Sequence, residues 1–199
     1  MLLPSACQIQ IGYTARGRLN PDAGGVPAIQ LRDLVSDGSF NPARPGYFAF
    51  DGAFERYLVR PGDVLFRSRG EATTAVALDE RLAEPAVAIL PLFILRPRRD
   101  VIAPAYLAWA LNQAPAQRHF DLTAQGQTLR MVSKASLDTL EIDVPDLATQ
   151  HAIVAVDALA RREQELALRA GELRRRLRTM ILVELAGTPR HAGAQKESA

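Results

Sequence analysis

The chain has 199 residues, 48% of them hydrophobic, and its 24 Lys and Arg against 22 Asp and Glu leave a formal net charge of +2. This size suits one globular domain with an extension, and so small a net charge points to no particular class of partner. One cysteine, Cys7, excludes an internal disulfide and a cysteine-rich zinc site, and the apolar run over 85–95 is too short to span a bilayer.

No secretory signal is visible at the N-terminus, so we expect a cytoplasmic protein without membrane association. Short strands are predicted through the first half of the chain. Within 1–12, Ile9 and Ile11 alternate with glutamines, and a Pro-Gly turn precedes a strand at 64–66 that enters a charged loop. The other expected segments are a loop over 12–27, a strand or strand–turn over 28–35, turns over 36–46, and strands over 73–80 and 86–97.

Helices are predicted in the second half. Pro104 stands at a permitted first-turn position and opens a helix that Pro115 ends. A second short helix is expected over 116–122, a third from Ser133, and a final strand over 140–145. Asp146 then caps a long helix.

The long helix covers 146–186 and contains no proline and a single glycine, Gly171. At ~1.5 Å per residue it forms a rod about 60 Å long, which one small domain cannot bury. Its apolar residues follow alternate spacings of three and four, interrupted by Glu163 and Glu184, and therefore form one narrow stripe that we expect to pack on a partner helix. The alternative is a long helix lying on the globular part. The stripe, our predicted dimer interface, consists of Val156, Leu159, Leu166, Ala170, Leu173, Leu177 and Met180.

These elements predict an α+β fold. A mixed, mostly β domain with short helices is expected over 1–145, followed by the long coiled-coil-type helix over 146–186 and a disordered tail over 187–199. On the long helix, Glu165 and Glu172 precede Arg169 and Arg176 by four residues, so we expect these arginines to be partly neutralised.

The chemistry of an active site is absent from the sequence. No glycine-rich phosphate-binding motif occurs, and the three histidines have no cysteine or carboxylate neighbours at metal-ligand spacing. Asp63 and Glu71 could be imagined as a metal-binding pair, but a nuclease would also place a lysine close behind the second acid. We therefore predict no catalytic residue, no metal and no cofactor.

Three segments in order, 58–70, 104–128 and 129–156, carry a family resemblance. The third holds a Gly126-x-Thr128 turn, a short helix at 133–137, a segment ending in Pro145, and Gln150 just inside a long helix. Together they resemble one target-recognition half of a type I restriction–modification specificity subunit. Asp146 departs from the family pattern, in which a proline is common at that position.

The resemblance implies a DNA-reading subunit without catalysis, whose partners are double-stranded DNA, a methyltransferase subunit and, further, a restriction (motor–nuclease) subunit. A full specificity subunit carries two recognition domains and two long helices, whereas this chain carries one of each. It therefore resembles a half-length form, which we expect to act as a homodimer on a bipartite inverted-repeat site.

Polar side chains gather in three of the expected loops. Arg and Gln can read guanine and adenine through two hydrogen bonds each, while Lys and Thr suit phosphate. A solvated loop is the alternative for each cluster. The candidate DNA-binding residues are Arg16 and Arg18 in the first loop, Arg67 and Arg69 after a strand, and Gln125, Gln127, Thr128, Arg130 and Lys134 around Gly126.

Two other functions stay open at this point. One is a non-catalytic scaffold that binds a protein partner through the long helix without DNA selectivity. The other is an enzyme whose site the sequence does not reveal.

Overall fold

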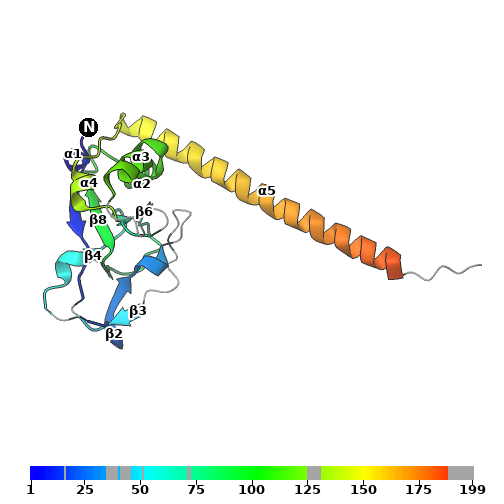
Figure 1. Cartoon of the computed structure of the whole chain (residues 1–199), viewed down its shortest axis with the longest axis horizontal. Helices are drawn as coiled ribbons and strands as arrows, with labels where there is room; N and C mark the ends of the chain where they lie inside the picture. The colour runs from blue at the N-terminus through cyan, green and yellow to red at the C-terminus, as the bar shows by residue number, and fades with distance from the viewer. Residues whose placement is uncertain are drawn as a thin grey trace, which may run out of the picture. The chain divides into compact units, whose positions relative to one another are not determined.

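The computed structural model of the chain describes residues 1–15, 17–34, 40, 46–50, 52–70, 73–124 and 131–187. It divides into two compact units, Met1–Val154 and Ala155–Ala199. Two four-stranded sheets, several short helices and one long helix confirm the α+β class (Figure 1). Within the described ranges, no helix is both long enough and apolar enough to cross a membrane.

The first sheet is wholly antiparallel, with strand order β1-β8-β5-β6. Four short helices pack on one of its faces, and the packed side chains include Phe66 from the sheet and Leu107 and Phe120 from the helices. The strands are β1 (Cys7–Ile11), β5 (Val64–Arg67), β6 (Thr74–Ala77) and β8 (Leu92–Pro97), and the helices are α1 (Leu3–Ala6), α2 (Pro104–Asn112), α3 (Ala114–Thr123) and α4 (Lys134–Asp138).

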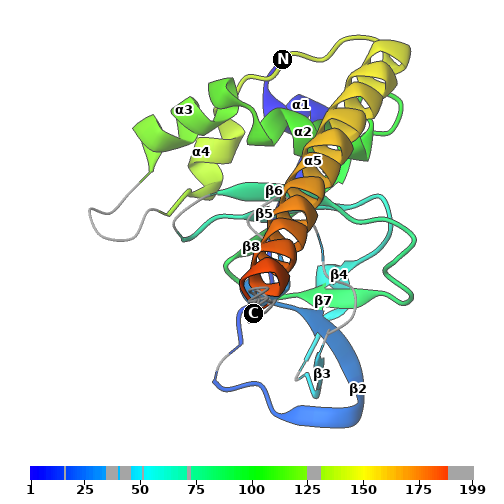
Figure 2. The same ribbon diagram turned by 90° about the vertical axis from the view of Figure 1, so that its right-hand side faces the viewer.

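The second sheet has the order β3-β2-β7-β4, in which only the β2–β7 pair is parallel. It faces the side of the first sheet that the helices leave uncovered, so three layers result (Figure 2). Its strands are β2 (Pro21–Ile29), β3 (Gly46–Phe48), β4 (Leu58–Val59) and β7 (Ala86–Ala88), and the 3₁₀ turns η1 (Leu31–Asp33) and η2 (Glu55–Tyr57) adjoin it.

Alternation along the central strands explains the layering. Successive side chains of a strand point to opposite faces. On β5, Val64 and Phe66 pack with the helices, whereas Leu65 packs with the second sheet. Since β8 alternates in the same way, the apolar parts of both strands, 64–66 and 92–95, are buried on both faces.

Several expected boundaries are wrong where pairing partners lie far away in the sequence. The segment 86–97 splits into β7 and β8, which belong to different sheets. The segment 140–145 forms no strand; it makes only an isolated bridge between Glu141 and Leu2. The predicted loop over 12–27 already contains β2 from Pro21, where a Cβ on Gly25 would lie 2.3 Å from the carbonyl oxygen of Phe48 on β3. The glycine is therefore needed for close strand pairing.

The predicted helix starts are confirmed at three places. A helix begins at Pro104, and Ser133 caps α4, since its Oγ accepts a hydrogen bond from the backbone N–H of Ser136 at 3.1 Å. Asp146 caps α5 (Leu147–Gly187): its carboxylate accepts hydrogen bonds from the backbone N–H of Thr149 at 2.9 Å and from its hydroxyl at 2.7 Å. These bonds lower the pKa of Asp146. The helix predicted from 116 starts two residues earlier, so that Pro115 lies in its first turn.

The first two turns of α5 belong to the first unit and are anchored by Gln150, which is fully buried. Its side-chain oxygen accepts a hydrogen bond from Ala103 N at 2.8 Å, and its nitrogen donates to Val101 O at 2.9 Å and to Pro145 O at 2.7 Å. Ile153 and Val154 of the same turns pack against the hydrophobic core of the first unit. One side of these two turns therefore packs against the rest of the first unit.

Candidate functional site

Arg67 and Arg69 stand where β5 leaves the first sheet, and the residue between them fixes the loop. Ser68 is 2% exposed, and its hydroxyl donates a hydrogen bond to Pro91 O at 2.7 Å. The Nε of Arg67 donates to Arg69 O at 3.1 Å. Gly70 follows with φ +131°, a conformation that side chains rarely adopt. The two arginines are therefore presented by an ordered turn.

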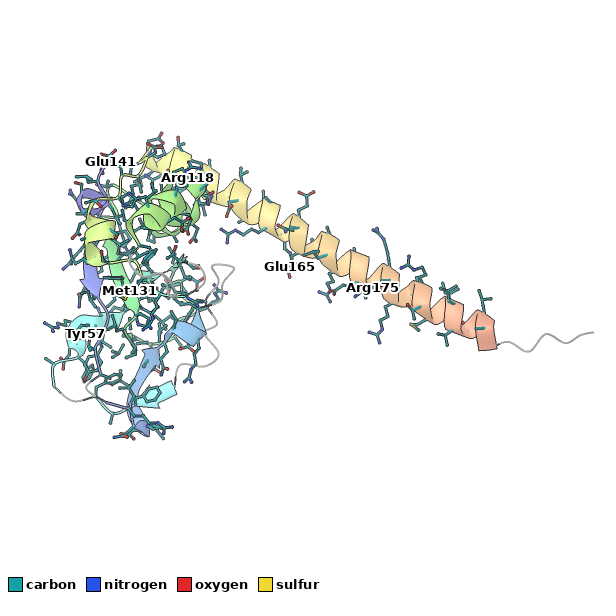
Figure 3. All side chains as sticks on the ribbon, viewed as in Figure 1. Tyr57, Arg118, Met131, Glu141, Glu165 and Arg175 are labelled. Atoms are coloured by element: carbon teal, nitrogen blue, oxygen red, sulfur yellow. The ribbon has the colours of Figure 1, made fainter. Side chains whose placement is uncertain are left out.

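A second segment is held against this arginine loop. Met131 forms an antiparallel bridge with Arg69, and Val132 N donates a hydrogen bond to Ser68 O at 2.8 Å. Met131 is the first described residue after the segment 125–130, and Figure 3 labels it. The chain leaving that segment thus runs beside the loop of Arg67 and Arg69.

Five of the predicted DNA-binding residues, Arg16, Gln125, Gln127, Thr128 and Arg130, lie outside the described residues. Lys134 is described, and its Nζ lies 2.8 Å and 2.7 Å from the two carboxylate oxygens of Asp138, one turn later in α4. Lys134 therefore forms an ion pair with Asp138. A phosphate would have to compete with that pair.

A pocket of about 670 Å³ adjoins Arg67 and contains residues that the sequence reasoning did not single out. Arg32 contributes a second guanidinium, whose Nε lies 4.0 Å from the carboxylate of Asp33. Burial raises the pKa of Asp33, and a hydrogen bond from Gln30 N together with the charge of Arg32 opposes that rise. Leu90, 43% exposed, lines the same pocket. No local pattern in the sequence marks either Arg32 or Leu90.

Arg18 lines a different pocket, of about 680 Å³, together with Tyr13, Arg56 and Tyr57. The Arg56 guanidinium lies over the Tyr57 ring, 4.6 Å from its centroid, in a cation–π contact. Figure 3 labels Tyr57, one of the residues that line this second pocket. Arg18 and Arg67, which belong to two different predicted clusters, therefore line separate pockets.

The described residues contain no group of three or more His, Cys, Asp or Glu side chains that could hold a metal ion. The Nε2 atom of His119 lies within hydrogen-bond distance of Ser136 O, at 2.9 Å. Burial raises the pKa of the Cys7 thiol to about 12, so this sulfur stays protonated at neutral pH. His119 is thus held by a contact within the fold, and Cys7 is buried in the core.

The second candidate surface is the apolar stripe of α5. Its six large side chains are 48–71% exposed, and Ala170 is half-buried. The expected neutralisation of Arg169 by Glu165 and of Arg176 by Glu172 is wrong. Glu165 instead pairs with Arg162, at 2.7 Å.

No protein-family model matches the sequence, and no curated protein matches it. Solved structures do match. A chain from a study of complex assembly and conformational transition of the type I R-M system is 22% identical with a TM-score of 0.62, over 90% of this chain and 42% of the other. The HsdS subunit from Thermoanaerobacter tengcongensis is 23% identical with a TM-score of 0.56, over 84% and 37% of the two chains.

The S subunit of a type I restriction–modification system from M. genitalium is 15% identical with a TM-score of 0.52, over 90% of this chain and 43% of the other. The fold thus resembles that of type I specificity subunits, which confirms the resemblance carried by the three sequence segments. The chain spans about two fifths of the length of each solved structure.

Proposed function

We propose that this chain reads duplex DNA as the specificity subunit of a type I restriction–modification system. The observation that carries the proposal is the bridge between Arg69 and Met131 within a fold like that of HsdS. It holds Met131, the residue that follows the glutamine-rich segment 125–130 in the sequence, against the loop of Arg67 and Arg69. Two groups of hydrogen-bond donors distant in sequence then serve one reading surface.

On that surface, Arg67, Arg69 and Arg130 are suited to guanine, and Gln125 and Gln127 to adenine. Thr128 and Lys134 are assigned to phosphate oxygens, which position the protein without reading sequence. Arg32 and the exposed Leu90 extend the surface on the side of Arg67. Arg16 and Arg18 are assigned to a separate, peripheral contact with the DNA.

The chain itself performs no catalysis in this proposal. It positions a methyltransferase subunit on the target, and a restriction subunit joins the same assembly. This division of labour is supported by the sequence, which offers no recognisable catalytic motif.

We further propose that two copies associate through the stripe of α5. The support is the exposure of its large apolar side chains. A twofold axis perpendicular to the helices near Leu168 makes them antiparallel. That axis pairs Val156 with Met180, Leu159 with Leu177, and Leu166 with Ala170.

The antiparallel arrangement also avoids a clash of charges. It sets Glu163 against Leu173, whereas a parallel pair in register would place Glu163 on Glu163 and Glu184 on Glu184 within the seam. Recognition domains at opposite ends of the helix pair would read two half-sites related by twofold symmetry. A helix of about 60 Å limits their separation to about 18 base pairs.

One experiment tests the proposal. The chain is co-expressed with the type I methyltransferase subunit of its own host, and the purified complex is incubated with S-adenosylmethionine and random-sequence DNA. Methylation confined to one inverted-repeat site with an unread spacer is expected. A complex that forms but methylates without sequence preference would support the scaffold function instead, and reaction by the isolated chain would point to an enzyme.

A further inference from the structure

Three arginines of α5 recur every seven residues along one edge of the apolar stripe. Arg162, Arg169 and Arg176 each stand directly before a stripe position, namely Glu163, Ala170 and Leu177. At 100° per residue, they line the same flank over about 21 Å. We call these three residues the arginine edge.

Most of the charge on the arginine edge is uncompensated. Arg162 pairs with Glu165 at 2.7 Å, whereas Arg169 and Arg176 form no ion pair within the part of the chain that the structure describes. All three side chains are exposed. The opposite flank, which follows the stripe leucines, begins instead with the small residues Ala160 and Ala167.

Antiparallel pairing would concentrate these charges. In the proposed homodimer the same flank of each helix lies along the same side of the seam, so Arg169 approaches its own copy and Arg162 approaches Arg176 of the second copy. Six guanidinium groups then form one strip, while Glu165 and Glu172 supply only four carboxylates. Like charges so placed repel one another. The strip therefore favours an anionic ligand.

We propose that the arginine edge of the dimer binds the phosphate groups of duplex DNA between the two half-sites. This rests on the proposed function, in which the helix pair joins the two recognition domains and the unread spacer runs alongside it. Guanidinium groups form paired hydrogen bonds with phosphate oxygens. A strip of about 21 Å faces about six base-pair steps, and contacts to phosphate carry no sequence requirement. An acidic protein helix is the competing occupant.

The test compares two triple variants in the methyltransferase complex. One carries Arg162→Gln, Arg169→Gln and Arg176→Gln. The matched control carries Arg174→Gln, Arg175→Gln and Arg178→Gln, which removes the same charge from other sides of the same helix. The affinity of each complex for a random-sequence duplex is measured across a range of salt concentrations. We expect the arginine-edge variant to lose up to about five units of the slope of log K against log salt, and the control to lose about one at most.

A second readout concerns the chain without DNA. Salt screens repulsion between exposed charges. The parent dimer should therefore tighten as salt rises, and the arginine-edge variant should associate more tightly than the parent at low salt. Folding of both variants is checked by their unfolding curves, since all six positions are exposed.

Equal salt slopes for the arginine-edge variant, the control and the parent would overturn the proposal. So would an arginine-edge variant that no longer assembles with the methyltransferase subunit although the control variant does, since the strip would then serve an acidic protein. The proposed function is tested separately, by measuring the sequence preference of methylation at a constant salt concentration. That preference should survive in the arginine-edge variant.

Discussion

The side chain of Asn112 replaces a missing neighbouring strand for Ala75. Its Oδ1 accepts a hydrogen bond from Ala75 N at 2.8 Å, and its Nδ2 donates to Ala75 O at 2.8 Å. Ala75 lies on β6, an edge strand of the first sheet, and is 1% exposed. The last residue of α2 therefore closes an edge that would otherwise leave buried backbone groups unpaired.

Replacing Asn112 with Leu should lower the free energy of unfolding by about 2–4 kcal/mol, because both backbone groups of the buried Ala75 lose their hydrogen-bond partner. Urea unfolding followed by circular dichroism measures the change. Asn20→Leu, at an exposed position, is the control and should leave the urea midpoint nearly unchanged. Equal midpoints for the two variants would contradict this role for Asn112.

Gln150→Ala should destabilise the first unit by about 2–4 kcal/mol, because Val101 O, Ala103 N and Pro145 O lose hydrogen bonds in a buried site. Hydrogen exchange at the backbone amide of Ala103 provides a local measurement, and that amide should exchange faster. Gln164→Ala, on an exposed position of the same helix, is the matched control. Unchanged protection at Ala103 would contradict the anchoring role.

Asp63 and Asp79 should give opposite pH dependences. Burial raises the pKa of Asp63, whereas the hydrogen bond from the Arg81 side chain lowers that of Asp79. A raised pKa means that the native state binds more protons than the unfolded state, so the contribution of Asp63 to stability falls as the pH rises above the ordinary pKa of aspartate. The contribution of Asp79 is present above that pKa and is lost as the pH falls below it.

The free energy of unfolding of Asp63→Asn, relative to the parent, should therefore rise with increasing pH through the acid range just above the ordinary aspartate pKa. For Asp79→Asn the same difference should fall with increasing pH in the range below it. Urea unfolding at a series of pH values tests both variants. Parallel curves for the two variants would show that burial does not dominate at Asp63.

Gln127→Ala or Arg130→Ala should relax or abolish target choice, since each lost bidentate base contact weakens discrimination by about 1–3 kcal/mol. The measurement is the ratio of methylation rates on target and non-target duplexes. Lys134→Ala should weaken binding to all sequences alike, and only modestly, because Asp138 already holds its ammonium group. Arg81→Ala, in a loop elsewhere in the domain, is the control. Unchanged ratios in both loop variants would place the reading surface elsewhere.

Replacing Leu166 and Leu173 with Asp should give monomers that lose selectivity for a bipartite site, because buried carboxylates in the seam are costly to desolvate. Light scattering at micromolar concentrations measures the state of association. Leu168→Asp is a matched control, since this leucine is 64% exposed and lies off the stripe. A parent chain that stays monomeric under the same conditions, or a DNA target without twofold symmetry, would contradict the proposed homodimer.

Local signals in the sequence account for much of the fold. Pro104 and Ser133 mark helix starts, and Asp146 marks the long helix, because capping depends on residues within one turn. The strand at 64–66 follows from its apolar run and the turn before it. What the sequence could not supply is pairing between distant residues, such as Val26 with Phe48 or Leu2 with Glu141. Strand pairing depends on such partners more than on local preference.

The same limit applies to the candidate site. The donors at Arg67 and Arg69 are visible in the sequence, but their position beside Met131 depends on a bridge between residues far apart in the chain. Arg32 and Leu90 meet Arg67 only because β5, η1 and the β7–β8 connection converge. No spacing rule predicts that convergence.

The anchor of α5 has a consequence for how new specificities could arise. All three partners of the Gln150 amide are main-chain atoms, of Val101, Ala103 and Pro145. Side chains at those positions can change without removing the bonds, provided that the backbone path is kept. A recognition domain of different sequence could then be joined to the same helix by recombination, upstream of Asp146, and still be held at the junction. The polar part of this junction therefore depends on the backbone path rather than on matched pairs of side chains.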